Sequence, residues 1–128
     1  MEPIALITAL ALIQYFWFGY LVSEARVRHD IKAPATSGHP EFDRRFRIHQ
    51  NTAEQLLAFI PAAWLFGWYV HALIGALIGV AFIAGRFIYQ QSYMRDPSTR
   101  TLGAVLSGVA TFVLVAGGAI GALVSWIG

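Results

Sequence analysis

Four polar side chains, Arg44, Arg47, Asn51 and Glu54, follow one another at spacings of three, four and three residues. These spacings place them on one face of an α-helix. The chain then runs apolar from Leu56 to Tyr69, and inside a membrane each unpaired charge costs roughly 2.5–3.5 kcal/mol or more. A stripe of this cost indicates a functional site, and its cations, amide and carboxylate suit a small ligand that carries both carboxylates and an amine.

A second stripe consists of Arg86, Tyr89 and Tyr93, again spaced for one helix face, with Gln90 on the same side. Short connections between helices bring both stripes to one level of the bilayer. The polar residues expected to gather there are Arg26, Arg44, Arg47, Asn51, Glu54, Arg86, Tyr89, Tyr93, Arg95 and Arg100. This surplus of arginine predicts an anionic ligand, held by bidentate pairing with its carboxylates.

The composition indicates a membrane protein of one domain, residues 1–128. The chain has 128 residues, of which 57% are hydrophobic and 12% charged, whereas soluble domains are about 45–50% apolar and about 25% charged. It contains no cysteine, so any thiol chemistry must bring its sulfur with the substrate. The net charge of +2 is small and its residues are dispersed, which argues against nucleic acid as a partner.

Four apolar stretches predict an all-α bundle of four transmembrane helices. The first begins with Glu2 in place of a basic segment and lacks a small-residue cleavage site, so we interpret it as a spanning helix and not as a signal peptide. Helix two reaches spanning length when its polar first turns are included. The stretches are Ile4–Leu21, Leu56–Val70, Ala72–Ile88 and Leu102–Ile127.

The helices that these stretches predict run from about Pro3 to Arg28, Glu41 to Tyr69, His71 to Tyr93, and onward from a turn in which Ser98 is the expected N-cap. Gly75 and Gly79 form a small-residue pair that allows a neighbouring helix to approach closely.

The distribution of charge predicts the topology. All nine lysines and arginines lie between the first two helices or around the connection between the last two. The positive-inside rule then places both basic loops in the cytoplasm and both termini outside, as expected for a protein of the bacterial inner membrane.

Several of these residues also have a purely structural interpretation. Arginines and lysines at helix ends commonly extend to the interface or set topology, which applies to Arg28, Lys32, Arg45 and Arg95. The Arg47–Asn51–Glu54 stripe can equally be an internal ion pair that holds the bundle. The second aligned stripe and the excess of positive charge favour a ligand site. The four histidines lack metal-ligand spacing, so we expect no metal.

Two runs of sequence resemble a known family. EFDRRFRIHQNTAEQ, which precedes an apolar helix, and RFIYQQSYMR, which is followed by Arg100, are similar to the paired motifs of the MAPEG superfamily, membrane-associated proteins in eicosanoid and glutathione metabolism. The resemblance covers nearly the whole chain, and the nearest branch is that of the microsomal glutathione transferases and cysteinyl-leukotriene synthase.

The resemblance implies a homotrimer of four-helix subunits that binds glutathione between neighbouring subunits near the cytoplasmic face. By position, Arg100 matches the arginine that activates the glutathione thiol. The matching glutathione-binding positions are Arg26, Arg47, Asn51, Glu54, Arg86, Tyr89, Gln91 and Tyr93. The sequence departs from the motif just after Glu54, where several relatives have a tyrosine and this chain has Gln55, Leu56 and Leu57.

The expected activity is that of a glutathione transferase acting on lipophilic electrophiles, with glutathione-dependent peroxide reduction as a related possibility that the motifs do not separate. A nearby cation favours the reactive thiolate, and the bilayer would deliver the second substrate. One alternative is a non-catalytic, lipid-binding scaffold. Another is a small multidrug transporter, which needs an ionisable residue near the bilayer midplane, where helix one offers only Gln14.

Overall fold

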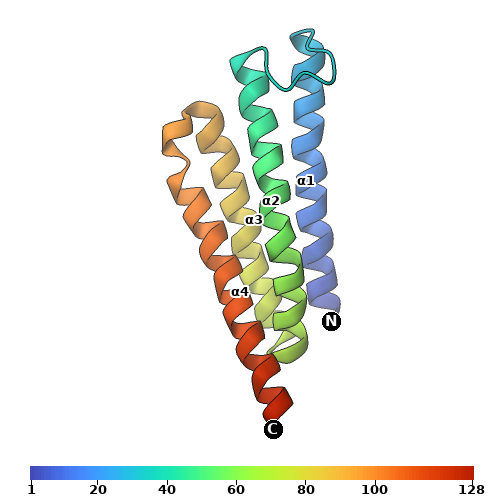
Figure 1. The fold of residues 1–128 in the computed structure, drawn as a ribbon, viewed down its shortest axis with the longest axis vertical. Helices are drawn as coiled ribbons and strands as arrows, with labels where there is room; N and C mark the ends of the chain where they lie inside the picture. Colours follow the sequence, from blue (N-terminus) through green and yellow to red (C-terminus); the bar gives the residue numbers. More distant parts are fainter.

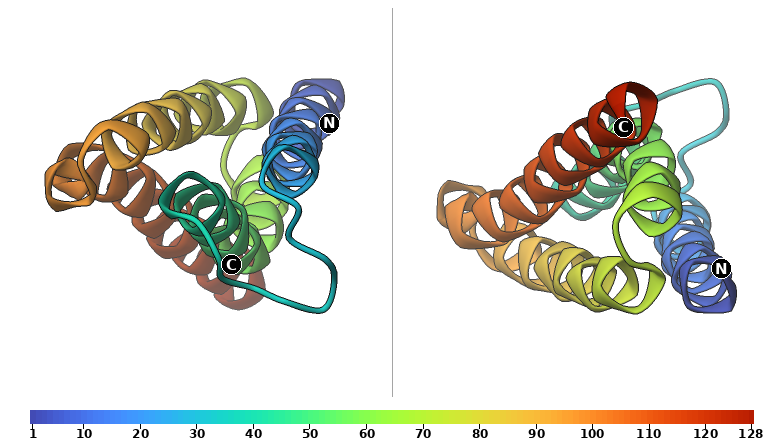
Figure 2. Two further views of the ribbon diagram at one scale, coloured as in Figure 1. Left: turned by 90° about the horizontal axis from the view of Figure 1, so that it is seen from above. Right: turned by 90° about the horizontal axis from the view of Figure 1, so that it is seen from below.

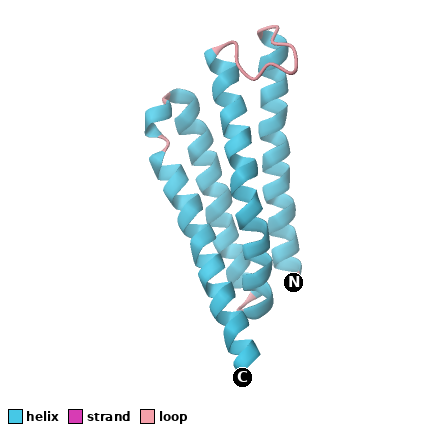
Figure 3. Cartoon of the chain, in the orientation of Figure 1, coloured by secondary structure: helices cyan, strands magenta, loops and turns pink.

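The computed structural model describes all 128 residues and consists of four long helices with no strand. The helices are α1 (Glu2–Arg28), α2 (Pro40–Tyr69), α3 (Ala72–Arg95) and α4 (Thr101–Ile127), and a short 3₁₀ turn, η1 (Pro97–Thr99), precedes α4. Figure 1 shows them side by side along one long axis, and Figure 3 shows how little of the chain lies in loops. The all-helical prediction is confirmed.

The α1–α2 loop and the α3–α4 turn lie at one end of the bundle, while both termini lie at the other (Figure 1). When the bundle is viewed along its long axis, α2 lies between α1 and α4, which are on opposite sides of the bundle (Figure 2). The two loops that the predicted topology places in the cytoplasm therefore lie at the same end. The prediction that both polar stripes lie at one level of the bilayer requires this arrangement. We call this the basic end of the bundle.

Three of the helices, α1, α3 and the η1–α4 segment, are long and apolar enough to cross a membrane. Helix α2 is as long but carries the polar stripe in its first half. Large apolar side chains cover the outside of the bundle, among them Phe16, Phe112 and Trp126. Because lipid is the solvent in which such an apolar surface is stable, the fold is that of a membrane protein.

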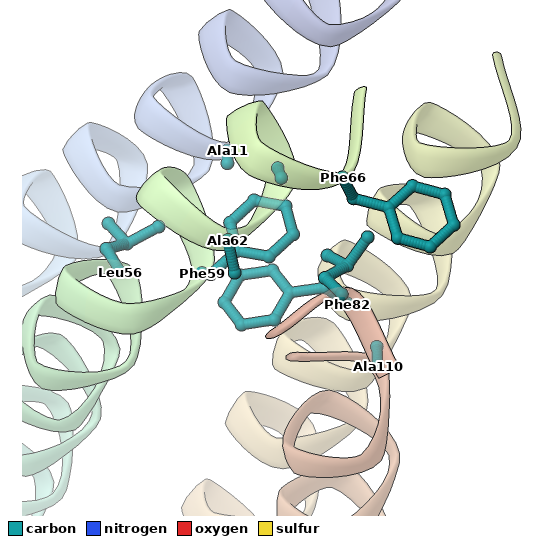
Figure 4. Packing of buried hydrophobic residues seen from close by; sticks show 9 residues of the cluster. Ala11, Leu56, Phe59, Ala62, Phe66, Phe82 and Ala110 are labelled. Carbon is teal, nitrogen blue, oxygen red and sulfur yellow. The ribbon is translucent and has the colours of Figure 1, made fainter. Parts of the chain in front are cut away.

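The centre of the bundle is built on an aromatic pair. The rings of Phe59 in α2 and Phe82 in α3 stack with centroids 3.9 Å apart and are fully buried. Small residues from the other two helices, including Ala11 and Ala110, complete this core (Figure 4). Helix α2 passes Pro61 without interruption, because the surrounding helices hold the segment in place.

The predicted helix boundaries are close to those observed, with one correction. Ser98 does not cap α4; it lies in η1, and its backbone N–H donates to Asp96 Oδ1 at 3.1 Å. This hydrogen bond lowers the pKa of the Asp96 carboxyl below its ordinary value. Arg100 takes the N-cap position of α4 instead, because one extra 3₁₀ turn is inserted between α3 and α4.

The glycine pair of α3 receives side chains from α1, as the small-residue spacing predicts. A β-carbon at Gly75 would lie 3.0 Å from Ile4 Cδ1, and one at Gly79 would lie 2.6 Å from Ile7 Cγ1. Both distances are shorter than ordinary contact, so a larger residue at either position would require the isoleucine side chains of α1 to shift.

Helices α3 and α4 come into backbone contact near the basic end. A β-carbon on Gly103 would meet the backbone of Tyr89 and lie 2.7 Å from the carbonyl oxygen of Gly85. A β-carbon on Gly85 would lie 2.8 Å from the backbone nitrogen of Ser107. This close approach brings Ser107 within reach of side chains on α3.

One buried arginine ties three helices together. Arg86 of α3 is 1% exposed, and its guanidinium donates to Asn51 Oδ1 at 2.7 Å and Thr52 Oγ1 at 3.1 Å on α2, and to Ser107 Oγ at 3.4 Å on α4. Thr52 and Ser107 donate their own hydroxyl hydrogens to carbonyls one turn earlier, so their lone pairs are available to Arg86.

The contact between α3 and α4 generates a stability prediction. Gly103→Ala places a methyl group against backbone that cannot rotate away, so we expect the free energy of unfolding to fall by about 1–3 kcal/mol. The matched control is Gly108→Ala, since no atom lies within 4 Å of that β-carbon. Unfolding in detergent micelles, followed by circular dichroism, measures both. Equal stabilities of the two variants would contradict the close approach.

The arginine tie generates a second prediction. Thr52→Val removes a buried acceptor from a guanidinium, and we expect a loss of about 1–3 kcal/mol in unfolding free energy. Thr111→Val is the control, because Thr111 is also buried and bonds the carbonyl one turn earlier, that of Ser107. A loss of the same size in both variants would show that the contact with Arg86 adds nothing.

Candidate functional site

A polar cavity of about 240 Å³ opens at the basic end of the bundle between α2, α3 and α4. We call it the cationic cavity. No residue of α1 contributes to its wall. The lining residues are Arg47, Asn51, Gln55, Arg86, Tyr89, Tyr93, Arg100 and Ala104.

The charge of this wall is entirely positive. Arg47, Arg86 and Arg100 line it, and no carboxylate does. Arg86 is the most buried of the three, and its three hydrogen-bond partners are all uncharged. Its Nε has no partner within the protein. Because a buried cation without an opposite charge is strongly unfavourable, this wall is suited to an anion that supplies the missing negative charge.

Arg86 also determines how Asn51 faces the cavity. The amide oxygen of Asn51 accepts from Arg86 Nη2, so the amide nitrogen, which can only donate, is left for a ligand. A further aromatic contact holds the arginine in place: its guanidinium carbon lies 4.4 Å above the ring of Tyr89. The groups that remain on the wall are therefore mainly hydrogen-bond donors.

The remaining wall comes from α3 and the start of α4. Tyr89 and Tyr93, one helical turn apart, stack with ring centroids 5.6 Å apart. Arg100 occupies the N-cap of α4, and Ala104 follows one turn later. The free N–H groups at a helix start carry partial positive charge, so the backbone of α4 adds to the potential of the three arginines.

Five of the residues predicted for the site, together with Arg100, meet at this cavity, and the structure places the others elsewhere. Glu54 is exposed on α2, with Oε1 4.0 Å from Arg47 Nη1, and Gln91 is exposed on another face of α3. Neither lines the cavity. The ion pair between Arg47 and Glu54 is long and solvated on both sides, so it contributes little to holding the bundle. The five that meet Arg100 are Arg47, Asn51, Arg86, Tyr89 and Tyr93.

Two arginines of the expected cluster instead fasten other parts of the chain. Arg26 donates to the carbonyls of Ile31 and Ala35 in the α1–α2 loop and lies over the ring of Phe42. Arg44 donates to the carbonyl of Met94 at 2.8 Å, so it joins the start of α2 to the end of α3 and does not reach the cationic cavity.

Four residues of the site and its support were not anticipated. Gln55 and Ala104 line the cavity, while Thr52 and Ser107 hold Arg86. Gln55 stands one turn after Asn51 and could have been found from helical spacing. Ser107 could not, because its role depends on the contact between Gly103 and Gly85, which spacing within one helix does not show.

No group of three or more metal-ligating side chains comes together in the structure. The histidines have local roles instead: His39 and His71 accept hydrogen bonds at the starts of α2 and α3. His49 stacks on Tyr15 with centroids 4.3 Å apart, and His29 stacks on His39.

Comparison with known proteins places the chain in a family. The model of the MAPEG family matches residues 4–120. An uncharacterized protein of Synechocystis is 37% identical over 88% of this chain and 82% of its own length. Human microsomal glutathione S-transferase 2 is 33% identical over 92% of this chain and 80% of its own. Mouse leukotriene C4 synthase is 32% identical over 97% and 83%. The chain therefore belongs to the MAPEG family.

Proposed function

We propose that this protein is a membrane-bound glutathione transferase that conjugates glutathione to lipophilic electrophiles. The observation that carries the proposal is the cationic cavity, whose wall holds three arginines and no carboxylate. Relatives that align over most of the chain are named for glutathione transfer and for leukotriene C4 synthesis. Both lines of support point to a glutathione-using enzyme of the membrane.

The chemistry of glutathione matches the donors of the cavity. Its two carboxylates are suited to Arg47 and Arg86, since guanidinium groups form charge-assisted hydrogen bonds with carboxylates. Asn51 offers its amide nitrogen, and the two tyrosines offer hydroxyl groups. The ammonium group of glutathione requires an acceptor, and we propose Glu54, whose carboxylate lies 4.0 Å from Arg47, for that role.

The cavity of one protomer is small for a tripeptide, since sites for small molecules typically occupy about 300–1,000 Å³, compared with about 240 Å³ here. We therefore propose a homotrimer in which a neighbouring subunit completes the site. In that assembly we propose that Gln91, on the exposed face of α3, and Arg26, whose Nη1 bonds loop carbonyls within the protomer, also contact a ligand held by the neighbour.

Arg100 is proposed as the catalytic residue. A free thiol has a pKa of about 8.5, and a nearby cation lowers it; each unit corresponds to about 1.4 kcal/mol of preference for the thiolate. Arg100 supplies a full positive charge, and the N-terminus of α4 adds its dipole. Together they favour the thiolate of bound glutathione at neutral pH.

The thiolate then attacks an electrophilic carbon of the second substrate. A carbon–sulfur bond forms as the bond to a leaving group or epoxide oxygen breaks, and the departing oxygen takes a proton. Peroxide reduction is the related proposal: the sulfur attacks the O–O bond, the alcohol leaves, and a second glutathione reduces the oxidised sulfur to give the disulfide and water. A bilayer-dissolved substrate reaches the site between apolar helices.

We further propose that the basic end faces the cytoplasm and that both termini face the opposite side. Six of the nine lysines and arginines lie between residues 26 and 47, from the end of α1 to the start of α2, and the other three lie in α3 or the turn after it. All nine are near this end of the bundle. Cytoplasmic segments of membrane proteins are those enriched in Lys and Arg. The cationic cavity then opens to the compartment that contains glutathione. The bacterial inner membrane is the corresponding location.

Thiolate formation tests the catalytic proposal. On mixing purified protein with glutathione near neutral pH in a stopped-flow spectrometer, we expect ultraviolet absorbance from the thiolate. Arg100→Ala should remove most of this signal, because the cation nearest the start of α4 is lost. Arg95→Ala is the control, since Arg95 is exposed at the same end of the bundle but does not line the cavity.

An unchanged signal in Arg100→Ala would assign thiol activation to another residue. Loss of the signal in both variants would indicate a general effect of charge at the basic end. No signal in the unmodified protein, combined with tight binding of lipid, would favour the non-catalytic scaffold.

A further inference from the structure

Gln55 differs from the rest of the cationic cavity in what it offers a ligand. The three arginines can only donate hydrogen bonds, and the amide oxygen of Asn51 already accepts from Arg86. The side chain of Gln55 is partly exposed, lines the cavity and makes no hydrogen bond within the protein. Its amide therefore presents a free acceptor and a free donor, and its oxygen is the only side-chain carbonyl that the wall leaves unpaired.

Gln55 lies at the end of a row of cavity residues on α2. Arg47, Asn51 and Gln55 follow one another at a spacing of four residues, so they share one side of the helix. From Arg47 to Gln55 the row covers about 12 Å of the helix axis at 1.5 Å per residue, and an extended tripeptide covers at most about 10–11 Å. A tripeptide that is bound to Arg47 and lies along this row therefore comes within reach of the Gln55 side chain.

The surroundings of Gln55 determine what a ligand must bring there. It is the last residue of α2 before the apolar run that begins at Leu56, so it stands where the polar half of the helix ends. A ligand bound at this point displaces water from the amide, and a polar group left unpaired after losing its water costs free energy. The ligand must therefore carry both a donor and an acceptor. A carboxylate has no donor, whereas a peptide backbone has both.

One residue of glutathione matches this pattern. In an extended chain the N–H and the C=O of one residue point the same way, so one side-chain amide can bind both. The cysteinyl residue has a peptide N–H and a peptide carbonyl. The γ-glutamyl residue has an ammonium group in place of the N–H, and the glycyl residue ends in a carboxylate. The cysteinyl residue is therefore the one that is complementary to Gln55.

We propose that Gln55 recognises the backbone of the cysteinyl residue of glutathione, with its amide oxygen accepting from the peptide N–H and its amide nitrogen donating to the peptide carbonyl. This inference rests on the proposed function, since it takes glutathione as the ligand. The arginines select for negative charge, which many small acids carry. Gln55 selects the peptide among those acids and holds the residue that bears the thiol.

The test compares two ligands by isothermal titration calorimetry on the full-length protein in detergent. One is glutathione, and the other is its ketomethylene analogue, in which CH₂ replaces the N–H between the γ-glutamyl and cysteinyl residues. The analogue keeps the thiol, both carboxylates and the ammonium group. The preference is the ratio of the two dissociation constants. It is measured in the unmodified protein, in Gln55→Met, and in Gln50→Met as the control, because Gln50 is exposed on α2 and does not line the cavity.

We expect the preference for glutathione to be about fivefold smaller in Gln55→Met than in the unmodified protein, which is the effect of one hydrogen bond between uncharged groups. The preference should be unchanged in Gln50→Met. Circular dichroism checks that each variant folds, and Gln55→Leu replaces Gln55→Met if that variant does not. The comparison between variants removes the contribution that the greater flexibility of the analogue makes on its own.

An equal preference in the unmodified protein and in Gln55→Met would overturn the assignment, and so would a variant that weakens both ligands alike, because Gln55 would then not read the peptide N–H. In either case the proposed function would stand, since glutathione still binds the unmodified protein. Failure of glutathione itself to bind the unmodified protein would overturn the proposed function and this inference together.

Discussion

A single buried cation organises the basic end of this bundle. Arg86 brings a positive charge among α2, α3 and α4, where its partners are an amide and two hydroxyls and no carboxylate. An internal ion pair would have neutralised that charge within the protein. The arrangement here leaves the charge uncompensated, so the wall of the cavity is most stable when an anion is bound. The burial of Arg86 therefore links the packing of the helices to the selection of a ligand.

The remainder of the fold makes this position of Arg86 possible. Glycines at 85 and 103 allow the backbones of α3 and α4 to touch, which brings Ser107 to the guanidinium. The stacked rings of Phe59 and Phe82 hold α2 against α3 deeper in the bundle. Helix α3 separates two environments, with the arginines and tyrosines of the cationic cavity on one side and an apolar groove between α1 and α3 on another. The proposed transfer of glutathione to a lipophilic substrate needs both environments close together.

The sequence was sufficient to predict the four helices, because long apolar stretches and polar turns are local signals. Helical spacing also predicted that Arg47 and Asn51 share a face, and that Arg86, Tyr89 and Tyr93 share another. It could not separate Arg44, which bonds the carbonyl of Met94, from Arg47, which lines the cavity, because spacing gives a face but not a partner.

The extra 3₁₀ turn after Asp96 and the contacts of Ser107 also escaped prediction. The turn depends on a local hydrogen bond of the Asp96 side chain, and the contacts of Ser107 depend on how closely two helices pack.

The most direct measurement of the central claim, that uncompensated arginines select the ligand, compares the binding of glutathione and of its diethyl ester by isothermal titration calorimetry. If uncompensated arginines select the ligand, esterification of both carboxylates should weaken binding at least tenfold. Equal affinity for the two compounds would contradict the account.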